Sequence, residues 1–191
     1  IMETIKGLKR TNYCGELRIE DAGKEVTLFG WCQRQRDLGN LIFIDLRDRT
    51  GLVQLSFNDT TDREVFAKAQ SVRAEYVVAA VGTVCERESK TNKIATGDIE
   101  INVKEFRIIS KAETPPFEIA KSEKVGDETT LKYRYLNLRN EKLTQNILMR
   151  HKIAKIAREY FYDNDFIEIE TPMMIKSTPE GARDYLSLIH I

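Results

Sequence analysis

The residues best suited to chemistry in this sequence lie on a strand-like run, residues 41–47, in which an aromatic ring alternates with charged side chains. The alternation puts Phe43 on the same side as Asp45 and Arg47, and puts two isoleucines and a leucine on the other side. A phenylalanine on the polar face of a sheet has no core to fill, whereas stacking on a nucleobase contributes about 1–3 kcal/mol. The pattern fits two interpretations equally: nucleic-acid binding at Phe43, or a solvated sheet face whose phenylalanine is covered by a loop.

Polar side chains on the neighbouring runs extend the same candidate face. Arg34 and Arg36 share one side of the preceding run, and Gln54 lies on the outer side of the following run. An arginine can bind a phosphate or a guanine edge, and a glutamine can donate and accept hydrogen bonds together. These three side chains are therefore candidate contacts to a nucleic acid.

Two other segments carry charged groups that could bind a ligand. Residues 132–139 alternate basic side chains with tyrosines and leucines. Such a pattern can follow a phosphate backbone, although for a single basic helix a solvated helix face is the favoured interpretation. Residues 177–185 form a loop in which Glu180 stands between a proline and a glycine, where a carboxylate could hold an ammonium group. From its residues alone, this loop is only a charged surface segment.

Several kinds of catalytic site are excluded by the residues available. Cys14, Cys32 and Cys85 lie far apart without zinc-type spacing, and their odd number argues against a disulfide framework. His151 and His190 are the only histidines, so a three-histidine metal site is impossible. The sequence has no glycine-rich phosphate loop and no pair of carboxylates placed for acid–base catalysis. We therefore expect no metal site and no catalytic residue in this chain.

The balance of charge and hydropathy excludes further classes of protein. The chain of 191 residues has 30 basic and 30 acidic residues, so it is neither a polybasic protein nor an acidic disordered one. Its basic surplus is concentrated in residues 131–160, with eight basic and two acidic side chains. No apolar run could span a bilayer, and residues 1–10 lack the apolar core of a secretory signal. With three unpaired cysteines, this predicts a cytoplasmic protein that contacts no membrane.

The elements that must position the candidate face are predicted by hydrophobic spacing. Three strand-like runs are followed by helical spacing over residues 62–74 and then by two more strand-like runs. This order, within under about 90 residues, is typical of a five-stranded barrel of the OB type, which often binds oligonucleotides on one face. A small β-sandwich is the alternative. The predicted strands are residues 26–31, 41–47, 53–57, 76–84 and 98–109.

The remainder of the chain is predicted to be helical after a break. The Thr-Pro-Pro of residues 114–116 ends the barrel, because proline cannot donate to a strand ladder. Polar residues follow, so residues 111–130 are predicted to be a linker. Residues 140–162 place apolar side chains three and four positions apart, which predicts a long helix with one apolar stripe. Residues 166–170 alternate like a strand and stop at a Thr-Pro pair.

Six short motifs occur in order along the chain: residues 11–17, 30–39, 41–49, 95–100, 132–139 and 177–185. Together they resemble the bacterial-type aspartyl-tRNA synthetases, a class II family, over about residues 10–186. The barrel motifs and the Tyr-Leu-x-Leu-Arg segment are also similar to asparaginyl- and lysyl-tRNA synthetases. The Thr-Pro-Glu-Gly-Ala-Arg-Asp-Tyr loop is the motif that is specific for aspartate.

The resemblance implies an α+β fold: a five-stranded OB-type β-barrel, a linker, and the helix–strand start of a class II catalytic domain. The implied domains are residues 1–110, which bind the anticodon, residues 111–130, a hinge, and residues 131–191, with motif 1 and the flipping loop. Phe43 would stack on an anticodon base. The implied tRNA-binding residues are Arg34, Arg36, Phe43, Gln54, Arg87 and Glu100.

The resemblance also implies the N-terminal fragment of an aspartate–tRNA ligase. Its partners would be L-aspartate, ATP with Mg²⁺, and tRNA for aspartate, with asparagine tRNA as a further candidate. Glu180 would hold the aspartate ammonium group, and Pro172, at the end of motif 1, would lie at a homodimer interface. The motif 2 arginine that grips the ATP α-phosphate has no counterpart here, nor has the glycine-rich motif 3. We therefore expect this fragment to bind no cofactor.

The sequence departs from the family in two places. Gln35 stands where the family usually has a third consecutive arginine, which predicts one phosphate contact fewer. Leu186 through Ile191 do not continue the family pattern, and we expect them not to be native protein. The rival interpretations are a stand-alone OB-fold tRNA-binding module, an asparaginyl- or lysyl-tRNA synthetase fragment, and a dimerisation protein built on the long helix.

Overall fold

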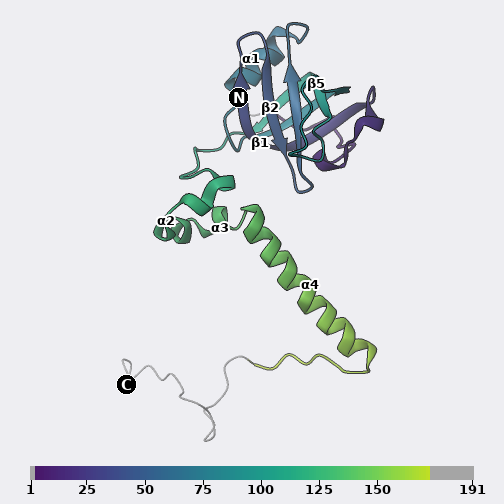
Figure 1. The fold of residues 1–191 in the computed structure, drawn as a ribbon, viewed down its shortest axis with the longest axis vertical. Coiled ribbons are helices and arrows are strands. Elements are labelled where there is room, and N and C mark those ends of the chain that lie inside the picture. Colours follow the sequence, from purple (N-terminus) through teal and green to yellow (C-terminus); the bar gives the residue numbers. More distant parts are fainter. Residues whose placement is uncertain (1–2, 173–191) are drawn as a thin grey trace, which may run out of the picture. The chain divides into compact units, whose positions relative to one another are not determined.

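The computed structural model describes residues 3–172, and the chain divides into two compact units, Ile1–Pro116 and Phe117–Ile191 (Figure 1). Glu180 and residues 186–191, for which the sequence makes predictions, lie outside the described residues. Within residues 3–172, no helix is both long and apolar enough to cross a membrane.

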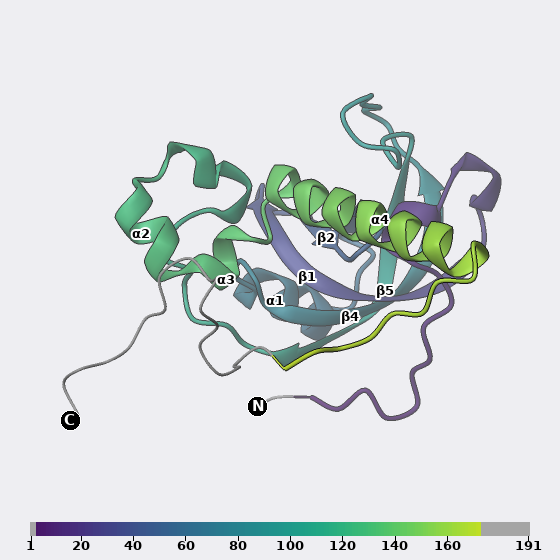
Figure 2. The ribbon, with the colours of Figure 1, turned by 90° about the horizontal axis from the view of Figure 1, so that it is seen from below.

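The first unit is a closed barrel with the strand order β1-β2-β3-β5-β4 (Figures 1 and 2). The predicted sequence of three strands, a helix and two strands is confirmed. Neighbouring strands pair antiparallel except β3 and β5, whose parallel pairing closes the barrel. The elements are β1 (Glu25–Asp37), β2 (Ile42–Arg47), β3 (Leu52–Phe57), α1 (Arg63–Ser71), β4 (Val77–Glu86) and β5 (Ile99–Ser110).

The barrel core follows the predicted alternation of apolar side chains. Ile42, Ile44 and Leu46 of β2 are fully buried, whereas the side chains between them are only half-buried. Phe57 and Phe106 meet edge to face across the core, with ring centroids 5.1 Å apart. The alternating positions therefore leave one continuous polar face on the outside of β2 and its neighbours.

Two local features of β1 decide what that face presents. A register shift between Cys32 and Arg34 accommodates an extra residue, after which Arg34 lies opposite Asp45 and Arg36 lies opposite Phe43. A turn follows β1, with Gly39 at a φ of +88°, a conformation that side chains with a Cβ rarely adopt. The bulge and the turn together fix the register of β1 against β2.

Helix α1 bridges β3 and β4 and packs on the barrel core. The Asp62 side chain caps its N-terminus by accepting hydrogen bonds from the backbone N–H groups of Glu64 and Val65. Ala69 and Val72 are fully buried in the core cluster. The helix predicted for residues 62–74 is thus present, and it ends at Ser71.

The second unit is helical in the residues that the structure describes. It contains the 3₁₀ segment η3 (Ile119–Lys124), α2 (Asp127–Lys132), α3 (Arg134–Asn137) and α4 (Glu141–Asp163). The predicted long helix is present as α4, and Asn140 caps it by accepting a hydrogen bond from Lys142 N–H. The sequence predicts a linker over residues 111–130. In the structure this range includes η3 and the start of α2, and Ile119, Ser122 and Thr130 within it are buried.

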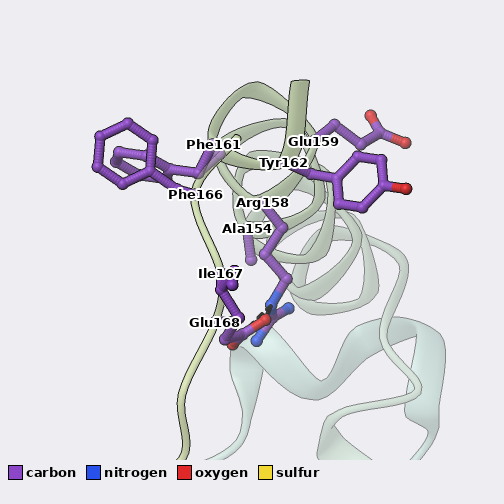
Figure 3. A pocket seen from close by; sticks show the side chains of 9 residues that line it. Ala154, Arg158, Glu159, Phe161, Tyr162, Phe166, Ile167 and Glu168 are labelled. Atoms are coloured by element: carbon purple, nitrogen blue, oxygen red, sulfur yellow. Dashed lines mark hydrogen bonds and ion pairs between the residues drawn. The ribbon is translucent and has the colours of Figure 1, made fainter. Parts of the chain in front are cut away.

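The strand predicted for residues 166–170 is absent from the structure. Asp165 adopts a φ of +64°, and the following residues lie along α4 without joining a sheet. Strand pairing needs a neighbouring strand, and the second unit has none in residues 117–172. In the structure, Ile167 of this segment lies beside α4 (Figure 3).

Candidate nucleic-acid interface

The outer face of the barrel brings together five of the six predicted tRNA-binding residues. Strand pairing places Asp45 opposite Gln54 and Gln54 opposite Glu100, so side chains of β2, β3 and β5 stand in one row. Arg36 approaches this row from β1, and Arg87 follows the end of β4. We call the hydrogen-bonded group the Gln54 cluster, which consists of Arg36, Asp45, Gln54, Arg87 and Glu100.

The amide of Gln54 is the centre of the cluster. Its Oε1 accepts hydrogen bonds from Arg36 Nη2 at 2.9 Å and from Arg87 Nη2 at 2.6 Å. Its Nε2 donates to Glu100 Oε2 at 2.8 Å. The two arginines and the glutamate therefore define which way the amide points.

Gln54 is buried although the sequence places it on the outer side of β3. Only 3% of Gln54 is exposed, because its neighbours in the cluster cover it. Ser56, the next outward position, is also buried, and its hydroxyl donates to the carbonyl of Ile101 at 3.2 Å. Strand parity thus predicts the face of a side chain correctly and says nothing about what covers it.

Arg36 connects the cluster to the aromatic ring of Phe43. Its Nη2 lies 3.1 Å from Asp45 Oδ1, and its guanidinium carbon lies 5.5 Å from the centroid of the Phe43 ring. Arg36 Nε is buried and has no hydrogen-bond partner among the described residues. Phe43 itself is half-buried on the outer face, opposite the small side chain of Ser56.

Asp45 is a member of the cluster that the sequence reasoning did not select. The signal for it was present, because Asp45 shares the outer parity of β2 with Phe43. The sequence prediction did not include Asp45, because an acidic residue does not itself bind an anion. In the structure, Asp45 is the ion-pair partner that orients Arg36.

Arg34 and Gln35 point to opposite sides of β1. Arg34 is exposed on the outer face, opposite Asp45. Gln35 Nε2 donates to the carbonyls of Ala69 at 2.7 Å and Gln70 at 3.1 Å, so it binds the C-terminal end of α1. Because neighbouring side chains alternate in a strand, an arginine at position 35 would not join Arg34 and Arg36 on their face.

Two cysteines of the barrel, Cys14 and Cys32, are buried thiols. Burial, together with the nearby charges of Asp45 and Glu75, raises the pKa of Cys32 to about 12. Burial and the adjacent Asp48 carboxylate likewise raise the pKa of the Cys14 thiol. Both thiols are therefore protonated near neutral pH. Within residues 3–172, no group of three His, Cys, Asp or Glu side chains is placed to hold a metal ion.

The basic run at residues 132–139 is not one continuous helix. Tyr133, with φ −106° and ψ 45°, separates α2 from α3. Lys132 Nζ lies 5.6 Å from the Tyr133 ring centroid, and the rings of Tyr133 and Tyr135 meet at 6.5 Å. The interleaved basic and aromatic residues thus contact one another on the surface of the second unit.

A hollow lies where residues 166–168 run beside the end of α4 (Figure 3). Phe161 of the helix meets Phe166 with ring centroids 5.5 Å apart, and Arg158 Nε lies 3.1 Å from a carboxylate oxygen of Glu168. No residue of α4 is buried, and Pro172 is also exposed. The exposed apolar side chains of α4 include Ile147, Met149, Ile153, Ile156 and Tyr160.

Comparison with known proteins identifies two family models along the chain. The model described as an OB-fold nucleic acid binding domain matches residues 26–109, and that of the class II tRNA synthetases (D, K and N) matches residues 126–190. The barrel and the helical unit thus correspond to two separately described domain families.

Individual proteins with similar sequences and structures agree with these family models. The chain is 54% identical over 186 residues to the aspartate–tRNA ligase of Ruminiclostridium cellulolyticum and to the aspartate–tRNA(Asp/Asn) ligase of Caldanaerobacter subterraneus. Each match covers 96% of this chain and 31% of the relative, so the chain spans about a third of these relatives' length. The solved aspartyl tRNA synthetase of Entamoeba histolytica is similar with a TM-score of 0.81 and 26% identity, over 92% of this chain and 42% of that one.

Proposed function

We propose that this chain, which belongs to the class II tRNA synthetases of the aspartate group, is the anticodon-reading part of an aspartate–tRNA ligase. The observation that carries the proposal is the Gln54 cluster beside the half-exposed ring of Phe43. We assign anticodon binding to residues 1–110, a hinge to residues 111–130, and the start of the catalytic domain to residues 131–191.

The cluster suits recognition of a nucleobase that has left its stack. The ring of Phe43 offers a surface on which one base can lie, with the Arg36 guanidinium beside it. Gln54, Arg36, Arg87 and Glu100 together carry donors and acceptors, so a base edge can replace their mutual hydrogen bonds without leaving a buried group unpaired. Exposed Arg34, on the same face, supplies a positive charge for the phosphate backbone.

We assign amino-acid activation to residues outside 3–172, the part of the chain that the structure describes. Class II tRNA synthetases use ATP and Mg²⁺, but residues 3–172 hold no group of carboxylates that fits a metal ion. We propose that ATP and Mg²⁺ bind to the remainder of the full-length enzyme and that Glu180 holds the ammonium group of L-aspartate. The catalytic steps are then performed by residues outside the described part of the chain. We also propose that the enzyme is cytoplasmic.

We further propose that the second unit contributes to a homodimer interface. Helix α4 exposes apolar side chains along its length, and residues 166–172 extend this surface to Pro172. A helix of 23 residues with no buried side chain needs a covering surface to be stable in water. In class II synthetases this segment corresponds to motif 1.

The tRNA substrate class extends the proposal. Some of the similar enzymes carry names that include both aspartate and asparagine tRNA. We propose aspartate tRNA as the substrate of this enzyme, and asparagine tRNA as a second substrate that differs from it in the anticodon.

Binding of tRNA transcripts to the 191-residue chain tests the proposed function. Trp31 is the only tryptophan of the sequence and lies partly exposed on β1, so its fluorescence reports on occupancy of this face. We expect tighter binding of an aspartate tRNA transcript than of the same transcript with a changed anticodon. Equal affinity for the two transcripts, or no binding of either, would contradict anticodon reading.

A further inference from the structure

A second group of arginines lies at the other end of β1 and β2, away from the Gln54 cluster. The guanidinium carbons of Arg10 and Arg49 both lie over the ring of Tyr13, at 4.6 Å and 4.5 Å from its centroid. We call these three residues the Tyr13 cluster. Two cations stacked on one ring concentrate positive charge at a single point of the barrel surface.

The Tyr13 cluster is held in place by contacts that fix the N-terminal segment on the barrel. Arg10 Nη2 donates to the carbonyl of Phe29 at 3.2 Å, and its guanidinium also lies 5.6 Å from the Phe29 ring centroid. Directly after Tyr13, the N–H of Cys14 donates to Asp48 Oδ2 at 2.7 Å. The next N–H, that of Gly15, donates to the Thr50 hydroxyl at 2.9 Å. The ring and both guanidiniums are therefore positioned before any ligand arrives.

The arginines of this cluster have no ion-pair partner among the described residues, although the Glu16 carboxylate lies nearby and accepts a hydrogen bond from the Tyr13 N–H at 3.1 Å. Arg10 and Arg49 are exposed, and neither forms an ion pair with a residue among 3–172. The acidic neighbour of Arg49, Asp48, uses its carboxylate to accept hydrogen bonds from Cys14 N–H and from the N–H and hydroxyl of Thr50.

Two other arginines of the barrel, Arg36 and Arg47, do form ion pairs. Arg36 is paired with Asp45, and Arg47 forms a two-oxygen contact with Glu75. Each of the two guanidiniums in the Tyr13 cluster can donate hydrogen bonds to an anion with several acceptor oxygens. The Tyr13 cluster therefore has the chemistry of an anion site.

The Tyr13 cluster lies beyond the end of the strand that carries Phe43 and Asp45. Outward positions of β2 run from Phe43 through Asp45 to Arg47, which lies opposite Trp31 of β1. At about 3.3 Å per extended residue, Phe43 and the end of β2 at Arg47 are about 13 Å apart, and Arg49 lies in the bend just after it. A strand of nucleic acid with one base on Phe43 can reach this distance within a few nucleotides.

We propose that Arg10 and Arg49 bind phosphate groups of the tRNA backbone that flanks the anticodon bases, with Tyr13 as the residue that positions both. This inference rests on the proposed tRNA binding and adds a second contact site to it. Each planar guanidinium can present two N–H donors to one phosphate. Contacts of this kind add affinity that does not depend on the base sequence.

The salt dependence of tRNA binding tests the inference. The affinity of the 191-residue chain for an aspartate tRNA transcript is measured between low and moderate salt, together with Arg10→Gln, Arg49→Gln and the double variant. Each lost phosphate contact lowers the slope of log affinity against log salt by about 0.7–0.9. We expect this decrease for each single variant and both decreases together in the double variant. The loss of affinity should be the same factor for the aspartate transcript and for one with a changed anticodon.

Two control variants separate a phosphate contact from an effect on folding or on general charge. Arg63→Gln removes an exposed arginine at the start of α1 and should leave the slope unchanged. The double substitution to lysine keeps both charges and should retain most of the slope. Thermal unfolding of every variant shows whether the barrel remains folded.

Each outcome bears on one proposal. Specific tRNA binding by the unmodified chain with an unchanged slope in the folded double variant overturns the phosphate site and leaves anticodon reading intact. A weakened affinity with an unchanged slope also overturns it, because the arginines would then act only through the structure. Failure of the unmodified chain to bind any transcript contradicts the proposed function instead.

Discussion

One glutamine amide on the barrel face holds two arginines and a glutamate in a fixed arrangement. The arginines lie at its oxygen and Glu100 lies at its nitrogen, so the three charged groups cannot be exchanged without changing the orientation of Gln54. A charged side chain at position 54 would repel either the arginines or the glutamate. A neutral residue with both a donor and an acceptor is the type that fits this position.

Phe43→Ala is expected to weaken binding of the cognate tRNA by about 1–3 kcal/mol, the usual contribution of one base stacked on an aromatic ring. Phe43→Tyr keeps the ring and should bind nearly as the unmodified chain does. Fluorescence titration with Trp31 as the reporter measures both. Unchanged affinity in the alanine variant would show that Phe43 does not stack on a base.

Gln54→Leu is expected to lower the free energy of unfolding of the barrel by about 1–3 kcal/mol. The reason is that Arg36, Arg87 and Glu100 each lose a hydrogen-bond partner in a half-buried setting. Urea unfolding measures the change, and Gln70→Leu, at an exposed position of α1, is the matched control. A variant as stable as the control would mean that the cluster contributes nothing to stability.

The turn between β2 and β3 also binds the N-terminal segment at Cys14 and Gly15. Asp48 accepts hydrogen bonds from this segment and from its own turn, and Gly15 packs so closely that a Cβ there would collide with the Thr50 carbonyl. The glycine is therefore required by the close approach of two backbones. Without this contact Tyr13 would not lie between Arg10 and Arg49.

The pH dependence of stability should report on the Asp48 contact. Burial alone would raise the pKa of Asp48, but hydrogen bonds from Cys14 and Thr50 outweigh it and lower the pKa of the folded state. The stabilisation is therefore complete above the ordinary carboxyl pKa of about 3.9 and is lost as the pH falls through the lower folded pKa. Urea unfolding between pH 2 and pH 6 should show a smaller loss of stability on acidification for Asp48→Asn than for the unmodified chain. The same acid loss in both chains would refute the assignment.

The order of elements could be predicted from the sequence because β2 and β5 alternate between buried and less buried residues. The period of two identifies the buried side of β2 and β5, and the Asp62 cap with helical spacing identifies α1. These signals are local, so they survive without knowledge of the fold. They also placed Phe43 and Gln54 on one face, whereas Glu100 was indicated only by the family resemblance.

Features that depend on distant partners could not be predicted in this way. The burial of Gln54 requires Arg36, Arg87 and Glu100, which belong to three other parts of the chain. Residues 166–170 have a strand-like alternation but no neighbouring strand in the described second unit, so the pattern does not yield a strand. Periodicity reports the preferences of a segment, whereas coverage and pairing are decided by what approaches it.

For the molecule as a whole, the two units differ in how completely they bury their apolar residues. The barrel encloses a continuous core, while every residue of α4 remains unburied in the described chain. The chain also spans only 31% of the similar ligases. The exposed apolar side chains of α4 are therefore the part of this chain most prone to aggregation.

The 191-residue chain is expected not to form aspartyl-adenylate. Its sequence lacks counterparts of the arginines that bind ATP in class II synthetases, and the described residues offer no metal site. ATP–pyrophosphate exchange with and without aspartate measures the reaction. Exchange that depends on aspartate and rises clearly above background would show that the activating residues are present after all.

The parallel pairing of β3 with β5 also sets the order in which the barrel can assemble. Gln54 and Glu100 are 46 residues apart, whereas β1, β2 and β3 are joined by short turns and can pair as soon as they are made. Bringing distant segments together costs more chain entropy than closing a hairpin, so non-local pairing is the slow event. During synthesis, the first three strands must therefore wait with an open edge until β5 has left the ribosome. The Gln54 cluster, which includes Glu100, is completed only at that moment.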